Sequence, residues 1–265
     1  MKLKRRKTIN DILKQKNSLV CLTAYTKPIA EIIDKFTDII LVGDSVGPVL
    51  YGYKSTRGVT LDMMIRHGKA VVESTKNSLI IIDLPFGSYE KKKELAYKNA
   101  RFLIKETGAT GIKLEGGEEI VPTVKYLVER GINVMGHVGM KPQLAVSSSD
   151  YKVYGKKEIE RKKIFKDVVA LENSGAFSIV IEATLENISR EITKLITIPT
   201  IGIGATIKCT GQILVTEDLI GHTNFKAKFL KKYGKLNKYI ELAVKNYCDD
   251  VKKKKFPSVK HVYRK

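Results

Sequence analysis

Eight short apolar runs recur along the chain, and most are separated by stretches with the spacing of amphipathic helices. The second run contains Ile39–Val42, four consecutive aliphatic residues, which is typical of a strand buried on both faces of a parallel sheet. The eight runs are 18–23, 38–42, 79–83, 110–115, 132–137, 177–182, 198–204 and 212–215. Their alternation with helices predicts an α/β fold, a (β/α)8 TIM barrel. A doubly wound open sheet is the competing architecture, but it seldom needs eight parallel strands in so regular an order.

The chain continues beyond the last run into a basic segment that we expect to be mostly helical up to Phe256-Pro257. A length of 265 residues suits a single barrel with an addition. We therefore expect residues 1–225 to form a catalytic barrel and residues 226–265 to form a basic helical C-terminal extension. The long loop 140–155, which contains Ser147–Ser149, has the length of a lid or binding loop.

The formal net charge of +20 is concentrated at the two ends of the chain. Residues 1–16 carry +6 and residues 226–265 carry +11, so only +3 remains for the 209 residues between them. A groove that binds nucleic acid needs its basic residues on the folded body, preferably with aromatic residues among them. The charge distribution therefore predicts a solvated surface and no nucleic-acid partner.

Targeting and redox signals are absent from the sequence. No apolar run approaches the ~18 residues of a membrane-spanning helix, and no apolar segment follows the basic N-terminus as it does in a signal peptide. Cys21, Cys209 and Cys248 are far apart and form no CxxC pair, which fits reduced thiols and does not support a zinc site. We therefore expect a cytoplasmic protein without a membrane partner.

Ionisable residues stand at the carboxyl ends of five consecutive runs. They are Asp44 (followed by Ser45), Asp83, Lys113 with Glu115, His137, and Glu182. A single carboxylate at such a position could simply cap the following helix. In a barrel, however, the carboxyl ends of all strands open onto one mouth, where ligands bind. The repetition over five runs therefore predicts one shared active site.

The residue types in this predicted site point to a metal-assisted reaction. Asp44, Asp83 and Glu115 would crowd three carboxylates together, which favours a cation between them. Oxygen ligands suit a hard ion such as Mg²⁺. Lys113 lies on the same strand face as Glu115 and could bind a substrate carboxylate, while Glu182 is the best candidate for a general base. The set predicts enolisation of a 2-oxo acid that chelates Mg²⁺.

Several longer blocks carry a resemblance to a known family. They are Leu41–Gly47, Asp83–Phe86, Ile112–Gly117, Gly136–Gly139 with Pro142-Gln143, Ile201–Ala205 and Gly211–Val215. In these blocks, and in their order over about residues 18–222, the chain resembles the ketopantoate hydroxymethyltransferases. The resemblance implies a Mg²⁺-dependent (β/α)8 barrel of the pantothenate pathway that transfers a hydroxymethyl group from 5,10-methylenetetrahydrofolate to 3-methyl-2-oxobutanoate. It also implies a homo-oligomer, typically a decamer.

The resemblance further implies a role for each candidate residue. It implies metal ligands at Asp44, Asp83 and Glu115, substrate contacts at Asp44, Ser45, Asp83 and Lys113, and catalytic roles for Glu182, as proton acceptor, and His137. A related Mg²⁺-dependent 2-oxo acid lyase or aldolase of the same barrel type, or hydroxymethyl transfer to a different 2-oxo acid, is the alternative.

The sequence departs from the family pattern in four loops. Arg57-Gly58 stands where Leu-Pro is usual, Ser149-Asp150 where Gly-Gly is usual, Thr206 where Gly is usual, and Glu217 where His is common. None of these positions holds a predicted metal ligand or the predicted base.

Overall fold

The computed structural model describes residues 5–145 and 150–264, so Ser147–Ser149 of the long loop lie outside the described residues. The chain divides into two compact units, Met1–Val215 and Thr216–Lys265. Each unit is described by itself below. The predicted boundary after residue 225 stays a prediction.

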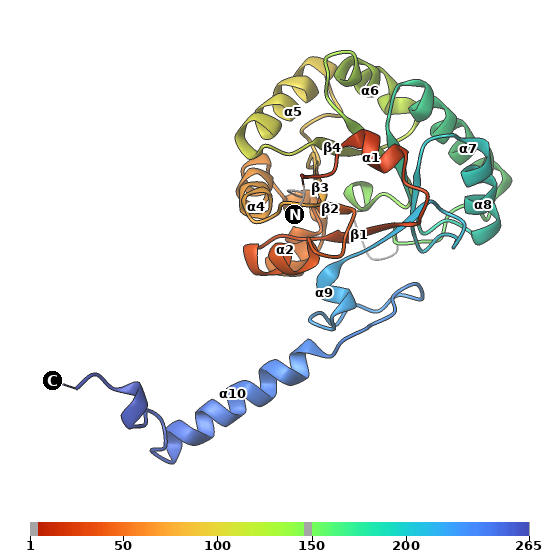
Figure 1. Cartoon of the computed structure of the whole chain (residues 1–265). Helices are drawn as coiled ribbons and strands as arrows, with labels where there is room; N and C mark the ends of the chain where they lie inside the picture. The colour runs from red at the N-terminus through yellow and green to blue at the C-terminus, as the bar shows by residue number, and fades with distance from the viewer. Residues whose placement is uncertain (1–4, 146–149, 265) are drawn as a thin grey trace. The chain divides into compact units, whose positions relative to one another are not determined.

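Eight parallel strands in the first unit close into a ring in which each strand pairs with its neighbour in chain order (Figure 1). The strands are β1 (Leu19–Thr23), β2 (Ile39–Val42), β3 (Leu79–Asp83), β4 (Gly111–Glu115), β5 (Val134–Gly139), β6 (Ser178–Glu182), β7 (Thr200–Ile203) and β8 (Gly211–Leu214). Each overlaps one of the predicted runs. The (β/α)8 barrel is confirmed, and β1 closes the ring by pairing with β8.

The helices α2 (Lys27–Ile33), α4 (Leu61–Glu73), α5 (Lys93–Thr107), α6 (Val121–Val128), α7 (Glu158–Asn173) and α8 (Glu186–Leu195) surround the ring (Figure 1). The short helix α1 (Ile9–Leu13) lies across one end of the ring, and α3 (Val46–Leu50) follows β2. Three short 3-10 turns lie in the loops: η1 (Thr56–Gly58), η2 (Glu118–Ile120) and η3 (Pro142–Leu144). The turn η2 leads directly into α6, which begins at Val121, just before a proline in its first turn. The short elements α1, α3, η1 and η3 were not predicted.

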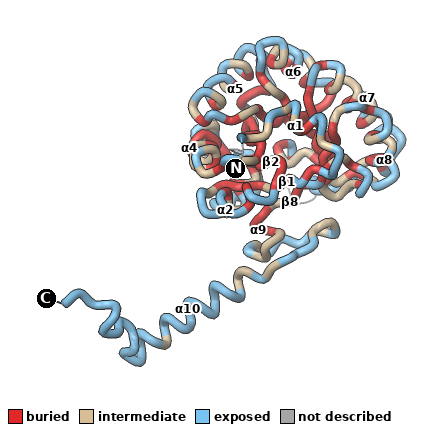
Figure 2. Tube along the Cα trace, in the orientation of Figure 1, coloured by how far each residue is buried: buried red, intermediate tan, exposed pale blue. Residues whose placement is uncertain are grey.

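Alternate strand residues pack on opposite sides of the ring wall. On β3, Ile80 and Ile82 belong to the apolar cluster that includes the helices, whereas Leu79 and Ile81 belong to a separate cluster inside the ring. The one buried residue of α1 joins this inner cluster. Asp83 is two residues after Ile81, so its side chain also points into the ring. The inner surface is therefore apolar towards the amino ends of the strands and polar at their carboxyl ends. Figure 2 shows the buried strands inside the exposed outer faces of the helices.

The second unit contains α9 (Thr216–Leu219), α10 (Leu236–Lys252) and the 3-10 turn η5 (Val259–His261). No residue of α10 is buried (Figure 2). The expectation of helix from about residue 225 was wrong for 225–235. This segment folds back, so that Gly234 N donates to Leu219 O at 3.3 Å and Leu236 N donates to Ile220 O at 3.0 Å. In the described part of the chain, no helix is both long and apolar enough to cross a membrane.

Candidate active site

The predicted site residues come together at the carboxyl mouth of the barrel because of the strand register. Asp83 on β3 pairs with Lys113 on β4. Glu115 on β4 pairs with His137 on β5, and Glu182 ends the next strand, β6. Neighbouring strands thus place acidic and basic side chains next to one another at the same level of the ring.

Lys113 is the central cation of this group, and its side chain is almost fully buried. Its Nζ lies 3.2 Å from Asp83 Oδ1, 3.9 Å from Glu115 Oε1 and 3.1 Å from His137 Nδ1. Burial alone would lower the pKa of the Lys113 ammonium, but the surrounding carboxylates overcome this effect and raise it. The ammonium therefore stays charged and partly neutralises the carboxylates around it.

Asp44 and Asp83 are buried acidic residues that lie next to each other. The backbone N–H of Asp44 donates to Asp83 Oδ2 at 3.0 Å. Burial, followed by repulsion from Asp83 and Glu115, raises the pKa of Asp44 well above its ordinary value. Burial also raises the pKa of Asp83, although Lys113 opposes the shift. Both carboxyl groups would be stabilised as anions by an added positive charge.

A glutamine and a tyrosine that the sequence analysis did not assign hold these carboxylates together. The Gln143 side chain donates from Nε2 to Asp44 Oδ2 at 2.8 Å, and its backbone N–H donates to Glu115 Oε2 at 3.0 Å. Tyr89 donates its hydroxyl to Gln143 Oε1 at 2.6 Å and accepts from the backbone N–H of Glu115 at 3.1 Å. Both residues are buried. Gln143 therefore links two acidic residues that come from different strands.

His137 lies between the central cation and the predicted base. Its Nε2 is 3.2 Å from Glu182 Oε2, and its Nδ1 is 3.4 Å from Glu115 Oε1. Burial and Lys113 both lower the pKa of His137, but Glu115 and Glu182 raise it more. The raised pKa favours the charged ring, and Nε2 is buried without a hydrogen-bond partner among the described residues although Glu182 Oε2 lies 3.2 Å away.

The backbone after β6 fixes the position of Glu182. Its carbonyl oxygen accepts from Met140 N at 3.0 Å and from Thr184 Oγ1 at 3.1 Å. The next residue, Ala183, has a φ of +42°, an uncommon conformation for a residue with a side chain. Such backbone strain at the end of a barrel strand is typical of a functional position.

Ser45 is held by a second buried tyrosine that the sequence analysis did not identify. The Tyr25 hydroxyl and Ser45 Oγ are 2.7 Å apart. The backbone carbonyl of Tyr25 lies 2.7 Å from His67 Nδ1, and His67 Nε2 lies 3.0 Å from the Tyr51 hydroxyl. His67 therefore connects the backbone of Tyr25 to the Tyr51 side chain.

The donor set fits a hard divalent cation. No group of three or more His, Cys, Asp or Glu side chains in the described ranges is already arranged to hold a metal ion. Mg²⁺ usually takes only one or two carboxylates and completes its shell with waters and substrate oxygens. Asp83 Oδ1 accepts no hydrogen bond from the described residues, although it lies 3.2 Å from Lys113 Nζ, and burial together with the neighbouring carboxylates raises the pKa of Asp44. Both observations mark a place for an additional positive charge.

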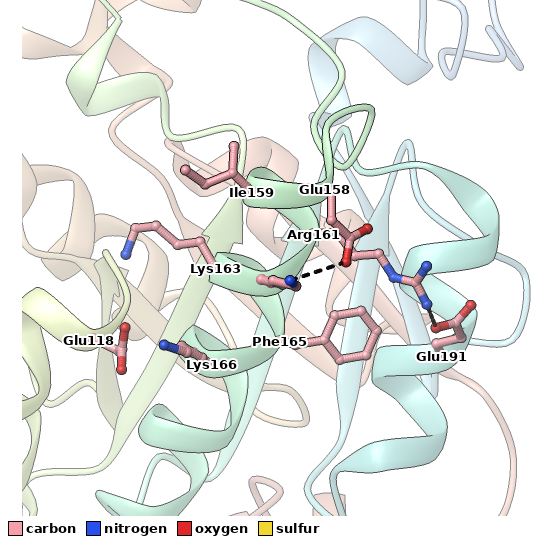
Figure 3. A pocket seen from close by; sticks show the side chains of 9 residues that line it. Glu118, Glu158, Ile159, Arg161, Lys163, Phe165, Lys166 and Glu191 are labelled. Carbon is pink, nitrogen blue, oxygen red and sulfur yellow. Dashed lines mark hydrogen bonds and ion pairs between the residues drawn. The ribbon is translucent and has the colours of Figure 1, made fainter.

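A different hollow of about 790 Å³ lies over the outer face of α7 (Figure 3). Its charged side chains are engaged in ion pairs, such as Arg161 Nη2 with Glu191 Oε2 at 2.7 Å and Lys163 Nζ with Glu119 Oε2 at 3.3 Å. No strand end lines it. Exposed ion pairs of this kind are common on helix surfaces, so we place the active site at the mouth of the barrel instead.

Comparisons with known proteins identify the family of the chain. The family model for ketopantoate hydroxymethyltransferase matches residues 5–259. The 3-methyl-2-oxobutanoate hydroxymethyltransferase of Rhizobium etli is 48% identical over 248 residues, covering 93% of this chain and 91% of that protein. The enzyme of the same name from Sinorhizobium fredii is 49% identical over 255 residues, covering 96% of this chain and 93% of the relative.

Among solved structures, the phosphonopyruvate hydrolase complex with oxalate and Mg²⁺ has a TM-score of 0.62 at 11% identity. The match covers 96% of this chain and 93% of that one, and it supports the fold. The extent of the family match and the identity to the two relatives support more than the fold. The chain therefore belongs to the ketopantoate hydroxymethyltransferase family and is a transferase.

Proposed function

We propose that the protein transfers a hydroxymethyl group from 5,10-methylenetetrahydrofolate to 3-methyl-2-oxobutanoate, giving 2-dehydropantoate for pantothenate biosynthesis. Family membership and the names of the relatives support this substrate pair. The observation that carries the proposal is the arrangement at the barrel mouth. A buried cation, Lys113, and two carboxylates with raised pKa values, Asp44 and Asp83, lie on one side of His137, and Glu182 lies on the other.

Asp44, Asp83 and Glu115 would hold Mg²⁺. When bound, the ion would supply positive charge to the carboxylate and keto oxygens of the 2-oxo acid, which makes the neighbouring carbon more acidic. Gln143 keeps Asp44 and Glu115 close together. The residues that would bind the ion therefore do not depend on substrate for their alignment.

The other side chains bind the acid and move the proton. Lys113 and the Ser45 hydroxyl would contact oxygens of the 2-oxo acid, and Tyr25 orients that hydroxyl. Glu182 would take the proton from C3, and His137 lies beside it, with Nε2 3.2 Å from Glu182 Oε2. The electron pair left at C3 forms the new bond to the methylene carbon of the donor. Both bonds from that carbon to N5 and N10 of the folate break: the new carbon–carbon bond replaces one of them, and a bond to the oxygen of water replaces the other. The proton taken from C3 and one proton of the water go to the two nitrogens, so the products are 2-dehydropantoate and tetrahydrofolate.

Proton exchange at C3 of 3-methyl-2-oxobutanoate tests the first step without the folate donor. With Mg²⁺ in D₂O, NMR should show loss of the C3 proton signal with the unaltered protein. Glu182→Gln should slow this exchange by about 10²-fold or more, because it removes the base while retaining the side-chain size. Exchange that is equally fast with this variant would show that another group takes the proton.

Product formation separates the proposed reaction from the alternatives. With the folate donor added, mass spectrometry should detect 2-dehydropantoate. Cleavage of a hydroxylated dicarboxylate, with no transfer to 3-methyl-2-oxobutanoate, would instead favour the lyase or aldolase. Preferential transfer to another 2-oxo acid would correct the acceptor.

We also propose a cytoplasmic homo-oligomer, with a decamer as the expected form. Exposed apolar side chains on α10, a helix without a buried residue, support association. They are Tyr239, Ile240, Leu242, Val244, Tyr247 and Val251. Multi-angle light scattering should give a mass about ten times the 29.7 kDa of one chain. A monomeric mass at micromolar concentration would contradict the proposal.

A further inference from the structure

An arginine in the loop after α3 lies at the mouth of the barrel. Arg57 belongs to η1, and its guanidinium carbon lies 4.1 Å from the centre of the Phe86 ring. Phe86 lies in the loop after β3, three residues beyond Asp83. The turn η1 also packs against η3, which carries Gln143. The turn that carries Arg57 therefore contacts two loops near the site: the loop after β3, which follows Asp83, and η3, which contains Gln143.

The charge of Arg57 is not neutralised by a neighbouring acid. No carboxylate of the described residues lies within ion-pair distance of its guanidinium, whereas Arg66 pairs with Asp62 at 2.7 Å and Arg161 pairs with Glu191 at 2.7 Å. Stacking on an aromatic ring holds the planar guanidinium by its face and leaves its N–H edge available. That edge matches two carboxylate oxygens.

The surroundings of Arg57 are fixed and partly apolar. A Cβ at Gly58 would lie 3.1 Å from the Tyr53 ring, so this turn and the ring are in close contact. Leu144 of η3 is 53% exposed, and Phe86 is half-buried. A ligand with both an aromatic ring and a carboxylate would find complementary groups on this part of the rim.

We propose that Arg57 and Phe86 form a subsite for the p-aminobenzoyl-glutamate part of the one-carbon donor, with Arg57 binding a glutamate carboxylate. The inference rests on the proposed function. The small 2-oxo acid has its own cation in Lys113, which is buried in the ring, whereas Arg57 is exposed at the rim. The donor carries both an aromatic ring and carboxylates.

The test measures KM values for two donors that differ only in the glutamate. Arg57→Met should raise the KM for 5,10-methylenetetrahydrofolate by about tenfold or more, because it removes a charge-assisted bidentate contact. It should leave the KM for the primary carboxamide of 5,10-methylenetetrahydropteroate, which lacks the glutamate and carries no carboxylate, within about twofold of the unaltered value. Arg57→Lys should recover part of the loss. Arg101→Met, on the exposed face of α5, is the matched control and should change neither KM.

Two outcomes would overturn the subsite. One is an Arg57→Met effect of equal size on both donors, and the other is a change in the KM for the 2-oxo acid alone. The C3 exchange reaction needs no donor, and the variant should support it at the unaltered rate. Normal exchange without discrimination between donors rejects the subsite and leaves the proposed function standing. Absence of any transfer from the folate by the unaltered protein rejects both.

Discussion

Replacing Gln143 with leucine tests whether the buried amide holds the acidic residues together. The side chain donates from Nε2 to Asp44 Oδ2 at 2.8 Å and to Leu84 O at 3.0 Å. Leucine has a similar volume, so loss of packing is a minor factor. The substitution leaves two buried acceptors without this donor, and one of them belongs to a carboxylate.

The expected magnitude follows from these two lost contacts. A buried acceptor left without its partner costs about 1–3 kcal/mol. The Tyr89 hydroxyl retains the carbonyl of Glu115 as an acceptor at 3.0 Å, so its own cost is small. We therefore expect Gln143→Leu to lower the free energy of unfolding by about 2–4 kcal/mol. It should also slow C3 exchange, because Asp44 loses its orientation.

The assay is urea unfolding of the full chain at 25 °C, followed by far-UV circular dichroism in the presence of EDTA. Gln212→Leu is the matched control, because Gln212 is exposed although its Nε2 donates to Thr206 O at 2.9 Å. This control should cost less than about 1 kcal/mol. Equal losses in the free energy of unfolding for the two variants would contradict the role of Gln143. So would a free energy of unfolding for Gln143→Leu within about 0.5 kcal/mol of that of the unaltered protein.

Four further substitutions test other positions of the barrel. Gly139 has a φ of +88°, and an added Cβ would lie 2.2 Å from the carbonyl oxygen of Glu182 at the end of β6. Gly139→Ala should therefore lower the free energy of unfolding by about 3 kcal/mol or more. Gly87→Ala, at φ +84° with open space around it, should cost only about 1–2 kcal/mol in the same urea assay, and equal losses would contradict the steric argument. Burial raises the pKa of Asp34, but hydrogen bonds from the backbone of 76–78 lower it more, so the folded pKa lies below the unfolded one. The stability that this carboxylate contributes is therefore present above about pH 4 and is lost as the pH falls through the folded pKa. Asp34→Ala should therefore lower the free energy of unfolding at pH 7 by about 2–4 kcal/mol and lose less stability than the unaltered protein on acidification. If the free energy of unfolding falls with pH equally steeply in both proteins, this account of Asp34 is wrong. Lys113→Met should cost about 3–5 kcal/mol in thermal or urea unfolding, because it leaves buried carboxylates unpaired, and a gain in stability would show that they are protonated in the folded protein.

The sequence predicted the ring of strands because both sides of the barrel wall are apolar. Runs such as Ile39–Val42 are buried on their inner and outer faces, which produces an unbroken aliphatic pattern. The polar strand ends were predictable for the same reason, since Asp83 and Glu182 interrupt apolar runs at their carboxyl ends. Site residues on strands were predictable because their place in the strand determines which way their side chains point.

The supporting residues could not be predicted from local pattern. Tyr25, Tyr89 and Gln143 lie in loops, and their contacts join segments that are 20 to 99 residues apart. The Pro142-Gln143 pair within a matching block was the one available signal for Gln143. The segment expected to be mostly helical is helical over α10, and the non-helical conformation of 225–235 was not predicted, because it depends on backbone contacts of Gly234 and Leu236 with Leu219 and Ile220. Such contacts leave no periodic trace in the sequence.

The strength of pairing is uneven around the ring. β5 and β6 pair at five positions, whereas β7 and β8 pair at only two. Thermal opening of the ring should therefore begin at the β7–β8 seam, and the amides of 211–214 should exchange with solvent deuterium sooner than those of 178–182. The candidate active-site residues lie on or beside β2–β6, so the barrel could open and close at this seam while the reacting groups keep their spacing.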